Sequence, residues 1–243
     1  MRIWFGVLLL GTALAEPHRT PIRGGVQHGY LSVQINVGTP PRPFEVILDT
    51  GSSRTVLPCV HCRDCGHDRQ YDPAQSSTAR NTRRPFSIRY VEGSSLMGTF
   101  YRDVLTIGNE TAHIDLGCAV LMTNLFRSQQ ADGITGLDDE PTSLVQALRR
   151  EHHSNTFGFH LCSAERWFEV GHSAPRHGLQ VPFHKHHGNY FLSARGVGVE
   201  GGAPLAHTSQ WLVDSGTTFI YVEQRLLRWV RQQLDLVPTD ASV

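Results

Sequence analysis

Two short stretches of the sequence each place one aspartate directly after an apolar run. The first is FEVILDTGSSRTVLPC at residues 44–59, and the second is WLVDSGTTFIYV at residues 211–222. In both, the aspartate is followed by a hydroxyl residue, a glycine and another hydroxyl residue; these are Asp49, Thr50, Gly51 and Ser52, then Asp214, Ser215, Gly216 and Thr217. The chain therefore carries two matched half-sites with one carboxyl group each.

Two carboxyl groups that lie side by side can share one proton, because their like charges oppose double ionisation. The ionised group then serves as a base towards water, and the protonated group as an acid towards a substrate carbonyl. The glycines fit tight turns that approach each other closely, since a side chain would block the approach. The alternative is two unrelated turns with an aspartate at a strand end.

The elements around the half-sites must bring them together. Residues 30–37 alternate apolar and polar side chains and predict a strand with one buried face. The GTPP segment at 38–41 predicts a turn into the strand that ends at Asp49. Residues 141–151 predict a helix capped by Thr142 or Ser143, and residues 222–236 predict an amphipathic helix.

A third stretch, RPFSIRYVEGSSLMGTFYRDVLTIG, contains two strand-like runs around a turn. Tyr90 ends the first run, and Gly93 and Ser94 lie in the turn, so the pattern predicts a β-hairpin. A plain surface hairpin is the alternative to a functional one.

The half-sites resemble those of pepsin-like aspartic endopeptidases. The resemblance implies an all-β, bilobal fold and an enzyme that hydrolyses peptide bonds of peptide or protein substrates through a water shared by two carboxyl groups, with no cofactor and no metal. It implies catalytic roles for Asp49 and Asp214, and support from Thr50, Ser52, Ser215 and Thr217. The hairpin resembles the flap that closes over substrate in this family. The resemblance implies that Tyr90, Gly93 and Ser94 contact the substrate.

Two further segments, residues 116–118 and residues 129–137, extend the resemblance to most of the region from Tyr30 to Leu236. The DGITG segment at 132–136 resembles the loop that passes behind the first half-site. Where pepsin has a tryptophan that holds the flap tyrosine, this chain has Val56.

Three cysteines, Cys59, Cys62 and Cys65, lie close together with two histidines nearby. Zinc binding is an open alternative, whereas a secretory address favours disulfides. With this cluster, the chain is most similar to plasmepsin V and its apicomplexan and alveolate relatives. We expect Cys118 to pair with Cys162, and two of the clustered cysteines to pair with each other.

The first fifteen residues predict the cellular location of the protein. MRIWFGVLLLGTALA combines an early arginine, an apolar run and a small-residue ending, as in a signal peptide. No other stretch is long and apolar enough to span a membrane, which predicts residence in the endoplasmic reticulum lumen or secretion. Asn109, Glu110 and Thr111 form a glycosylation sequon.

Composition describes an ordinary globular chain: 243 residues, 22 basic and 22 acidic residues, and 40% hydrophobic content. This balance does not favour nucleic acid binding. GVGVEG at 196–201 matches a dinucleotide-binding pattern only formally, because no helix follows it. HKHH at 184–187 is expected to form a solvated turn rather than a metal site.

The expected organisation is a signal peptide (1–15), a short N-terminal segment (16–25), a first β lobe (26–162) and a partial second β lobe (163–243). A full second lobe of the resembled family continues further, so the sequence predicts a truncated one. Self-association through the incomplete lobe is one way in which the chain could close it. The alternative to an active enzyme is an inactive fragment that binds peptides or partners.

Overall fold

Strands dominate the computed structural model of the chain, which confirms the predicted all-β class. The structure describes residues 19–25, 27–63, 65–152, 156–161, 165–171, 180–198, 202 and 204–234. The predicted signal peptide and Cys162 lie outside these residues. The strands are β1 (Arg19–Pro21), β2 (Arg23–Gly25), β3 (Tyr30–Val37), β4 (Arg42–Asp49), β5 (Val56–Pro58), β6 (Arg80–Arg89), β7 (Ser95–Ile107), β8 (Glu110–Met122), β9 (Gly133–Gly136), β10 (Phe157–His160), β11 (Trp167–Val170), β12 (Phe183–His186), β13 (Asn189–Val197) and β14 (Leu205–Leu212). The helices are α1 (Leu125–Ser128), α2 (Leu144–His152), α3 (Gln224–Gln233) and the 3-10 turn η1 (Pro73–Gln75).

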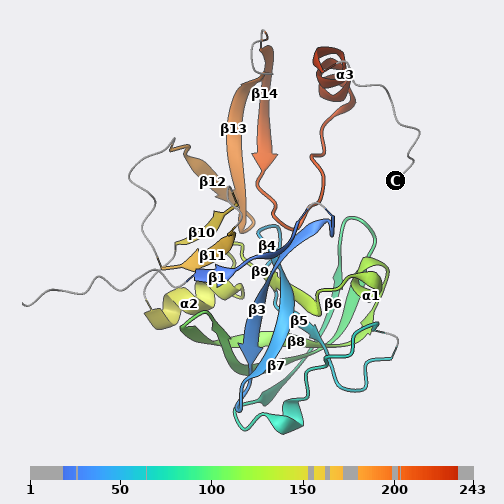
Figure 1. The fold of residues 1–243 in the computed structure, drawn as a ribbon, viewed down its shortest axis with the longest axis vertical. Coiled ribbons are helices and arrows are strands. Elements are labelled where there is room, and N and C mark those ends of the chain that lie inside the picture. The colour runs from blue at the N-terminus through green and yellow to red at the C-terminus, as the bar shows by residue number, and fades with distance from the viewer. Residues whose placement is uncertain are drawn as a thin grey trace, which may run out of the picture.

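The largest sheet has eight strands in the order β2-β3-β4-β9-β5-β8-β7-β6 and forms the lower body of the molecule in Figure 1. Strand β3 has the predicted alternation, because Val33, Ile35 and Val37 are buried while Gln34 is exposed. Strand β4 is instead buried at every position from Phe44 on, which explains its continuous apolar run. The strand that delivers the first half-site is therefore central to the sheet.

Strands β6, β7 and β8 form two long hairpins at the edge of this sheet. The first contains the predicted turn after Tyr90, with Arg89 paired to Ser95. The second turns at Gly108 and Asn109. These pairings confirm the hairpin that the sequence predicts.

Helix α2 covers part of the core of the eight-stranded sheet. Leu144, Ala147 and Leu148 are buried, as their spacing predicts. The Gln146 amide donates a hydrogen bond to the Ser143 hydroxyl (3.3 Å), so Ser143 caps the helix.

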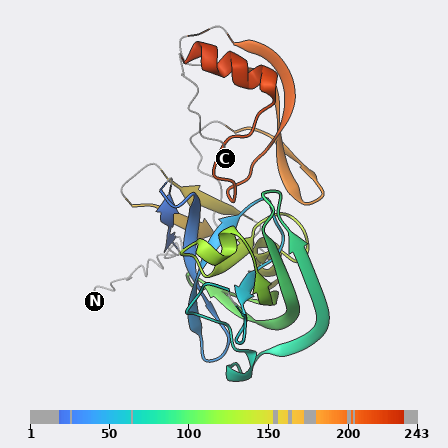
Figure 2. The same ribbon diagram turned by 90° about the vertical axis from the view of Figure 1, so that its right-hand side faces the viewer.

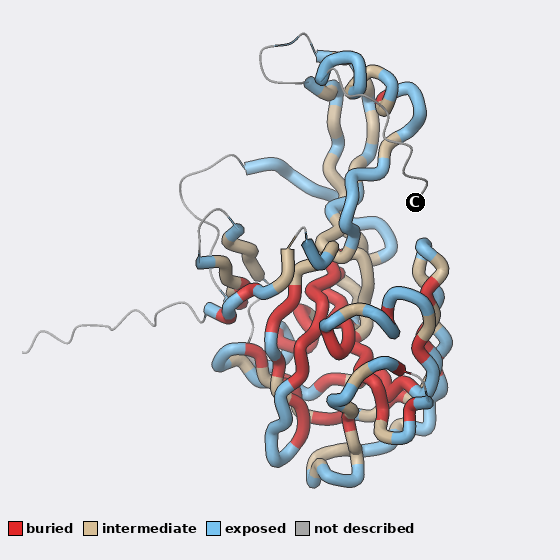
Figure 3. Tube along the Cα trace, turned by 45° about the vertical axis from the view of Figure 1, so that its right-hand side comes forward, coloured by how far each residue is buried: buried red, intermediate tan, exposed pale blue. Residues whose placement is uncertain are grey.

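Two three-stranded sheets complete the structure. One has the order β1-β11-β10, and the other, β12-β13-β14, rises above the large sheet together with α3 (Figure 2). The part of the tube formed by residues 180 onward is mostly intermediate or exposed (Figure 3). Among the described residues there, Leu226 of α3 is the buried one. The region from residue 180 onward thus carries little core of its own among the described residues.

The disulfides correct one prediction and confirm another. Cys118 of β8 bonds to Cys59, with their Cα atoms 4.6 Å apart, and not to Cys162. The reason is register: β5 runs parallel to β8, which brings the residue after β5 beside Cys118. Cys62 and Cys65 pair with each other, as expected for two members of the cluster.

Within the described part of the chain, none of the helices combines the length and apolar character that crossing a bilayer requires.

Candidate active site

Strand β9 holds the end of β4 that carries Asp49. The two strands pair in parallel there, and the Leu137 amide donates a hydrogen bond to the Asp49 carbonyl (2.8 Å). The Asp132 carboxylate accepts a hydrogen bond from the Glu45 amide (2.7 Å), which fixes the start of the loop. The segment 132–136 therefore lies behind the first half-site.

Asp214 follows β14 and is held from the β13 side. The Val213 amide donates to the Tyr190 carbonyl (2.9 Å), and the Tyr190 hydroxyl donates to the Leu137 carbonyl (2.9 Å). Leu137 itself bonds to Asp49, so one short chain of contacts connects the backbones that carry both aspartates.

Thr50 and Ser215 cross between the two turns. The Thr50 amide donates to the Ser215 hydroxyl oxygen (3.1 Å), and the Ser215 amide donates to the Thr50 hydroxyl oxygen (2.9 Å). Each hydroxyl also donates across: Thr50 to the Val213 carbonyl and Ser215 to the Leu48 carbonyl, both at 2.7 Å. Each half-site thus makes the same two hydrogen bonds to the other, and the four bonds join the half-sites.

Two donors hold the Asp49 carboxyl group. The Gly51 amide donates to Oδ1 (2.9 Å), and the Ser52 hydroxyl donates to Oδ2. Asp49 is only 5% exposed. Burial raises its pKa from 3.8 to about 7; the Asp214 charge adds to the rise, and the Ser52 and Gly51 hydrogen bonds oppose it. Asp49 therefore holds a proton in mildly acidic solution.

Asp214 has the same two donors in a more open setting. The Gly216 amide donates to Oδ1 (2.9 Å), and the Thr217 hydroxyl donates to Oδ2. Asp214 is partly exposed, whereas Asp49 is buried. The two carboxyl groups therefore have matching donors but differ in their exposure to solvent.

Each carboxyl group lies against the glycine of the opposite turn. A Cβ on Gly51 would come within 2.8 Å of the Asp214 Cγ, and a Cβ on Gly216 within 2.7 Å of the Asp49 Cγ. Both distances are shorter than real Cβ atoms adopt. Glycine at both positions is therefore what allows the two carboxyl groups to approach.

Tyr90 lies close to the first half-site, in the turn of the β6–β7 hairpin. Burial raises the pKa of its phenol above the ordinary value; the Asp49 charge adds to this, and the Ser52 hydroxyl partly offsets it. The phenol oxygen is buried and has no hydrogen-bond partner of good geometry among the described residues. Its ring packs on Phe126, with centroids 5.1 Å apart.

Gly93 and Ser94 shape this turn. Gly93 has φ +97°, in the region that favours glycine, and its amide donates to the Tyr90 carbonyl (3.0 Å). The Tyr90 amide in turn donates to the Ser94 carbonyl (2.9 Å). Ser94 is fully buried, whereas Val91 and Glu92 are exposed. The turn thus presents Val91 and Glu92 to solvent and keeps Tyr90 on its inner side.

Sequence reasoning missed three participants. The carbonyls of Leu48 and Val213 accept the crossing hydroxyls. Their signal was available, because each residue immediately precedes its aspartate in the repeat. Phe126, which packs on Tyr90, had no local signal in the sequence.

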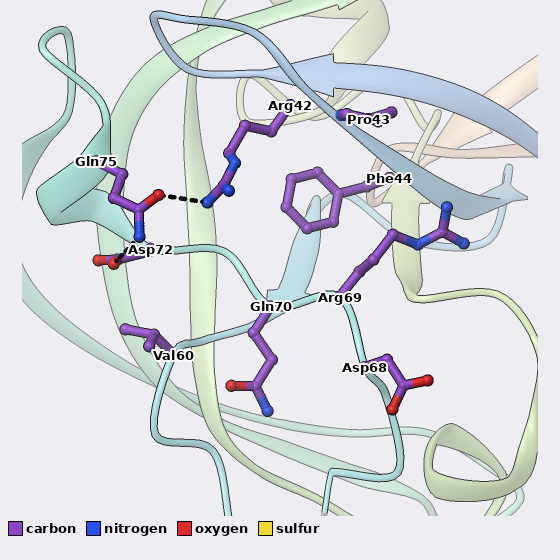
Figure 4. A pocket seen from close by; sticks show the side chains of 9 residues that line it. All are labelled: Arg42, Pro43, Phe44, Val60, Asp68, Arg69, Gln70, Asp72 and Gln75. Carbon is purple, nitrogen blue, oxygen red and sulfur yellow. Dashed lines mark hydrogen bonds between the residues drawn. The ribbon is translucent and has the colours of Figure 1, made fainter.

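A separate hollow of about 370 Å³ lies near the start of β4 (Figure 4). Asp49 lies at the other end of that strand. Its charged lining is balanced, with Arg42 and Arg69 against Asp68 and Asp72. The described residues contain no group of three or more His, Cys, Asp or Glu side chains arranged to hold a metal.

Comparison with known proteins gives a consistent result. The profile of a family described as "Eukaryotic aspartyl protease" matches residues 30–157, slightly more than half of the chain. Chymosin of Camelus dromedarius is 33% identical over 133 residues, covering 52% of this chain and 34% of chymosin. Aspartic protease 5 of Toxoplasma gondii is 33% identical over 148 residues, covering 45% of this chain and 15% of that protein.

A vacuolar aspartic protease of Candida albicans is 28% identical over 247 residues, covering 90% of this chain and 59% of that protein. The chain spans about a third of the length of the chymosins it matches. Since the family profile covers more than half of the sequence and falls on the first half-site and its flap, the protein belongs to the eukaryotic aspartyl protease family.

Proposed function

We propose that the protein is an aspartic endopeptidase that hydrolyses peptide bonds of peptide or protein substrates with Asp49 and Asp214 as its catalytic pair. The observation that carries this proposal is the crossed approach of the two half-sites, in which each carboxyl group lies against the glycine of the opposite turn. The supporting residues are Thr50, Ser52, Ser215 and Thr217.

The unequal burial of the pair suggests how the roles divide. Asp214, the more exposed group, acts as the base and takes a proton from a water between the two carboxyl groups. The water oxygen bonds to the substrate carbonyl carbon, while Asp49 gives its proton to the carbonyl oxygen. Asp214 then passes its proton to the amide nitrogen, and the C–N bond breaks. Asp49 regains a proton as the diol becomes a carboxylic acid, so the pair returns to its starting state.

A peptide library incubated with the full chain at about pH 4 to 6 tests the proposal. This pH range lies between the ordinary pKa of Asp49 and its raised value. Cleavage is expected for the natural chain and for Asp68→Asn, whose carboxylate is exposed and remote from the pair. Asp49→Asn and Asp214→Asn should each abolish it. Cleavage that persists in either of these two variants would remove the pair from the mechanism.

A second candidate function is peptide or partner binding without cleavage. The observation that favours it is a run of exposed apolar side chains just after the second half-site: Phe219 is 60% exposed, Ile220 83% and Tyr221 74%. In the same experiment, retention of peptides without new termini would support a binding module over an enzyme.

We also infer passage through the secretory route, with residues 1–15 as signal peptide and lobes at 26–162 and 163–243. The signal-peptide pattern of residues 1–15 and the likeness to a vacuolar aspartic protease of Candida albicans support this inference. Asn109 of the sequon is exposed in the turn between β7 and β8. A eukaryotic host should therefore yield protein that lacks residues 1–15 and carries an enzyme-removable glycan. Unglycosylated cytosolic protein with an intact N-terminus would contradict the inference.

A further inference from the structure

The Tyr90 side chain packs against the buried cluster that contains Phe126. Its hydroxyl has no well-formed hydrogen bond within the described residues, although it is buried. Its ring meets Phe126 at a centroid distance of 5.1 Å and an interplanar angle of 54°. This tilted geometry lies in the favourable range for aromatic pairs. The ring contact with Phe126 is therefore one constraint on the direction in which the phenol points.

Phe126 is itself held firmly, although α1 is a helix of only four residues. Such a short helix has little stability of its own. The His67 Nε2 donates a hydrogen bond to the Phe126 carbonyl (2.6 Å), since a carbonyl can only accept. Gly66 lies against the backbone of Arg127, where a Cβ would come within 2.9 Å of the carbonyl carbon. The Phe126 side chain is 4% exposed.

The Cys62–Cys65 disulfide lies just before His67 in the sequence. Both cysteines belong to the same buried cluster as Phe126, against which Tyr90 packs. A contact path thus leads from the disulfide loop through α1 to the flap tyrosine.

The base of the flap is fastened to the segment before α1. The Ser95 amide donates to the Thr123 hydroxyl oxygen (2.8 Å), and the Thr123 amide donates to the Ser95 carbonyl (3.1 Å). These bonds fix the end of the hairpin turn but not the Tyr90 ring. Base and ring are therefore held by different neighbours.

We propose that Phe126 is a positioning residue that holds the Tyr90 ring over the Asp49 side of the site, with His67 anchoring Phe126 from behind. The proposal deepens the proposed endopeptidase function and rests on it. Flap order determines how well a substrate is enclosed, so loss of the Phe126 ring should loosen the flap and weaken turnover through Tyr90.

Hydrogen exchange at the Tyr90 and Gly93 amides tests the first step without any substrate. In the full chain, Phe126→Ala should speed exchange of these amides by about two- to tenfold, the range expected from loss of an aromatic pair. His67→Ala should act in the same direction. Phe126→Leu keeps apolar bulk and should restore part of the protection, and Leu125→Ala, at a 59% exposed neighbour on the same helix, should change nothing.

A kinetic double-mutant cycle tests the second step. Phe126→Ala should lower kcat/KM by about two- to tenfold in the natural chain and have no further effect in a Tyr90→Ala background. A residue that only stabilises the lobe would lower kcat/KM by the same factor in both backgrounds, and this result would overturn the proposal. Unchanged exchange in Phe126→Ala would overturn it as well. If the natural chain cleaves no peptide, the endopeptidase proposal fails, while the exchange experiment still decides the role of Phe126 in the flap.

Discussion

Gly51 lies directly against the carboxyl group of Asp214, a residue from a different sheet and a distant part of the sequence. Any side chain larger than a hydrogen atom at position 51 would clash with this carboxyl group. Its counterpart, Gly216 against Asp49, repeats the relationship in the other direction. The two turns can therefore meet because both contact positions are glycine, as well as because hydrogen bonds join them.

Gly51→Ala should push the two carboxyl groups apart. The added methyl group would meet the Asp214 Cγ at 2.8 Å, and overpacking of this kind costs about 1 to 3 kcal/mol. Peptide cleavage should fall sharply while the circular dichroism spectrum stays that of the natural chain. Gly198→Ala is a suitable control, because its methyl group would meet Pro204 at an ordinary 3.6 Å. Equal activity of the two variants would contradict the packing argument.

Thr50→Val should loosen the connection between the half-sites. The substitution removes the hydroxyl that accepts from the Ser215 amide and donates to the Val213 carbonyl. A buried polar group left without its partner costs about 1 to 3 kcal/mol. Urea denaturation should therefore report a lower free energy of unfolding for Thr50→Val than for Thr50→Ser, which keeps the hydroxyl. The idea fails if valine and serine variants are equally stable.

The raised pKa of Asp49 predicts that stability falls as pH rises. Unfolding returns the pKa from about 7 to 3.8, so the folded state binds more protons between these values. Since stability decreases with pH wherever the folded state holds the extra proton, the free energy of unfolding should decline from about pH 4 to about pH 7. The decline should flatten above that range and be smaller in Asp49→Asn. Equal slopes for both proteins would show that another group is responsible.

The Cys59–Cys118 bond should contribute more stability than the Cys62–Cys65 bond. Its partners are 59 residues apart, against three for the smaller loop. Chain entropy assigns about 4 kcal/mol to the larger loop and about 2 kcal/mol to the smaller one. Paired alanine variants compared by denaturation without reductant measure the difference. Non-reducing peptide mapping should recover a Cys59–Cys118 peptide; a Cys118–Cys162 peptide would contradict the structure.

Local patterns were sufficient for the parts of the site that repeat. The apolar run, the aspartate and the flanking hydroxyls of Thr50 and Ser215 occur twice, so their equivalence is visible in the sequence. The alternation in β3 and the hairpin at Tyr90 follow from period and turn chemistry alone. These features depend on residues that are close in the chain.

Features that depend on register between distant strands were not accessible in the same way. The partner of Cys118 is set by the parallel pairing of β5 with β8, and no spacing of cysteines encodes that pairing. Phe126 reaches Tyr90 because α1 follows β8 beneath the flap, and its sequence neighbourhood resembles any short helix. Tertiary placement decided both cases.

The crossing bonds of Thr50 and Ser215 join positions 165 residues apart. A ribosome must therefore deliver the chain beyond Ser215 before either aspartate has its final neighbours. Until then, Asp49 of the emerging polypeptide lacks the contacts that the Asp214 turn provides. If the two aspartates form the proposed catalytic pair, that pair is assembled only after both turns have been synthesised and have met.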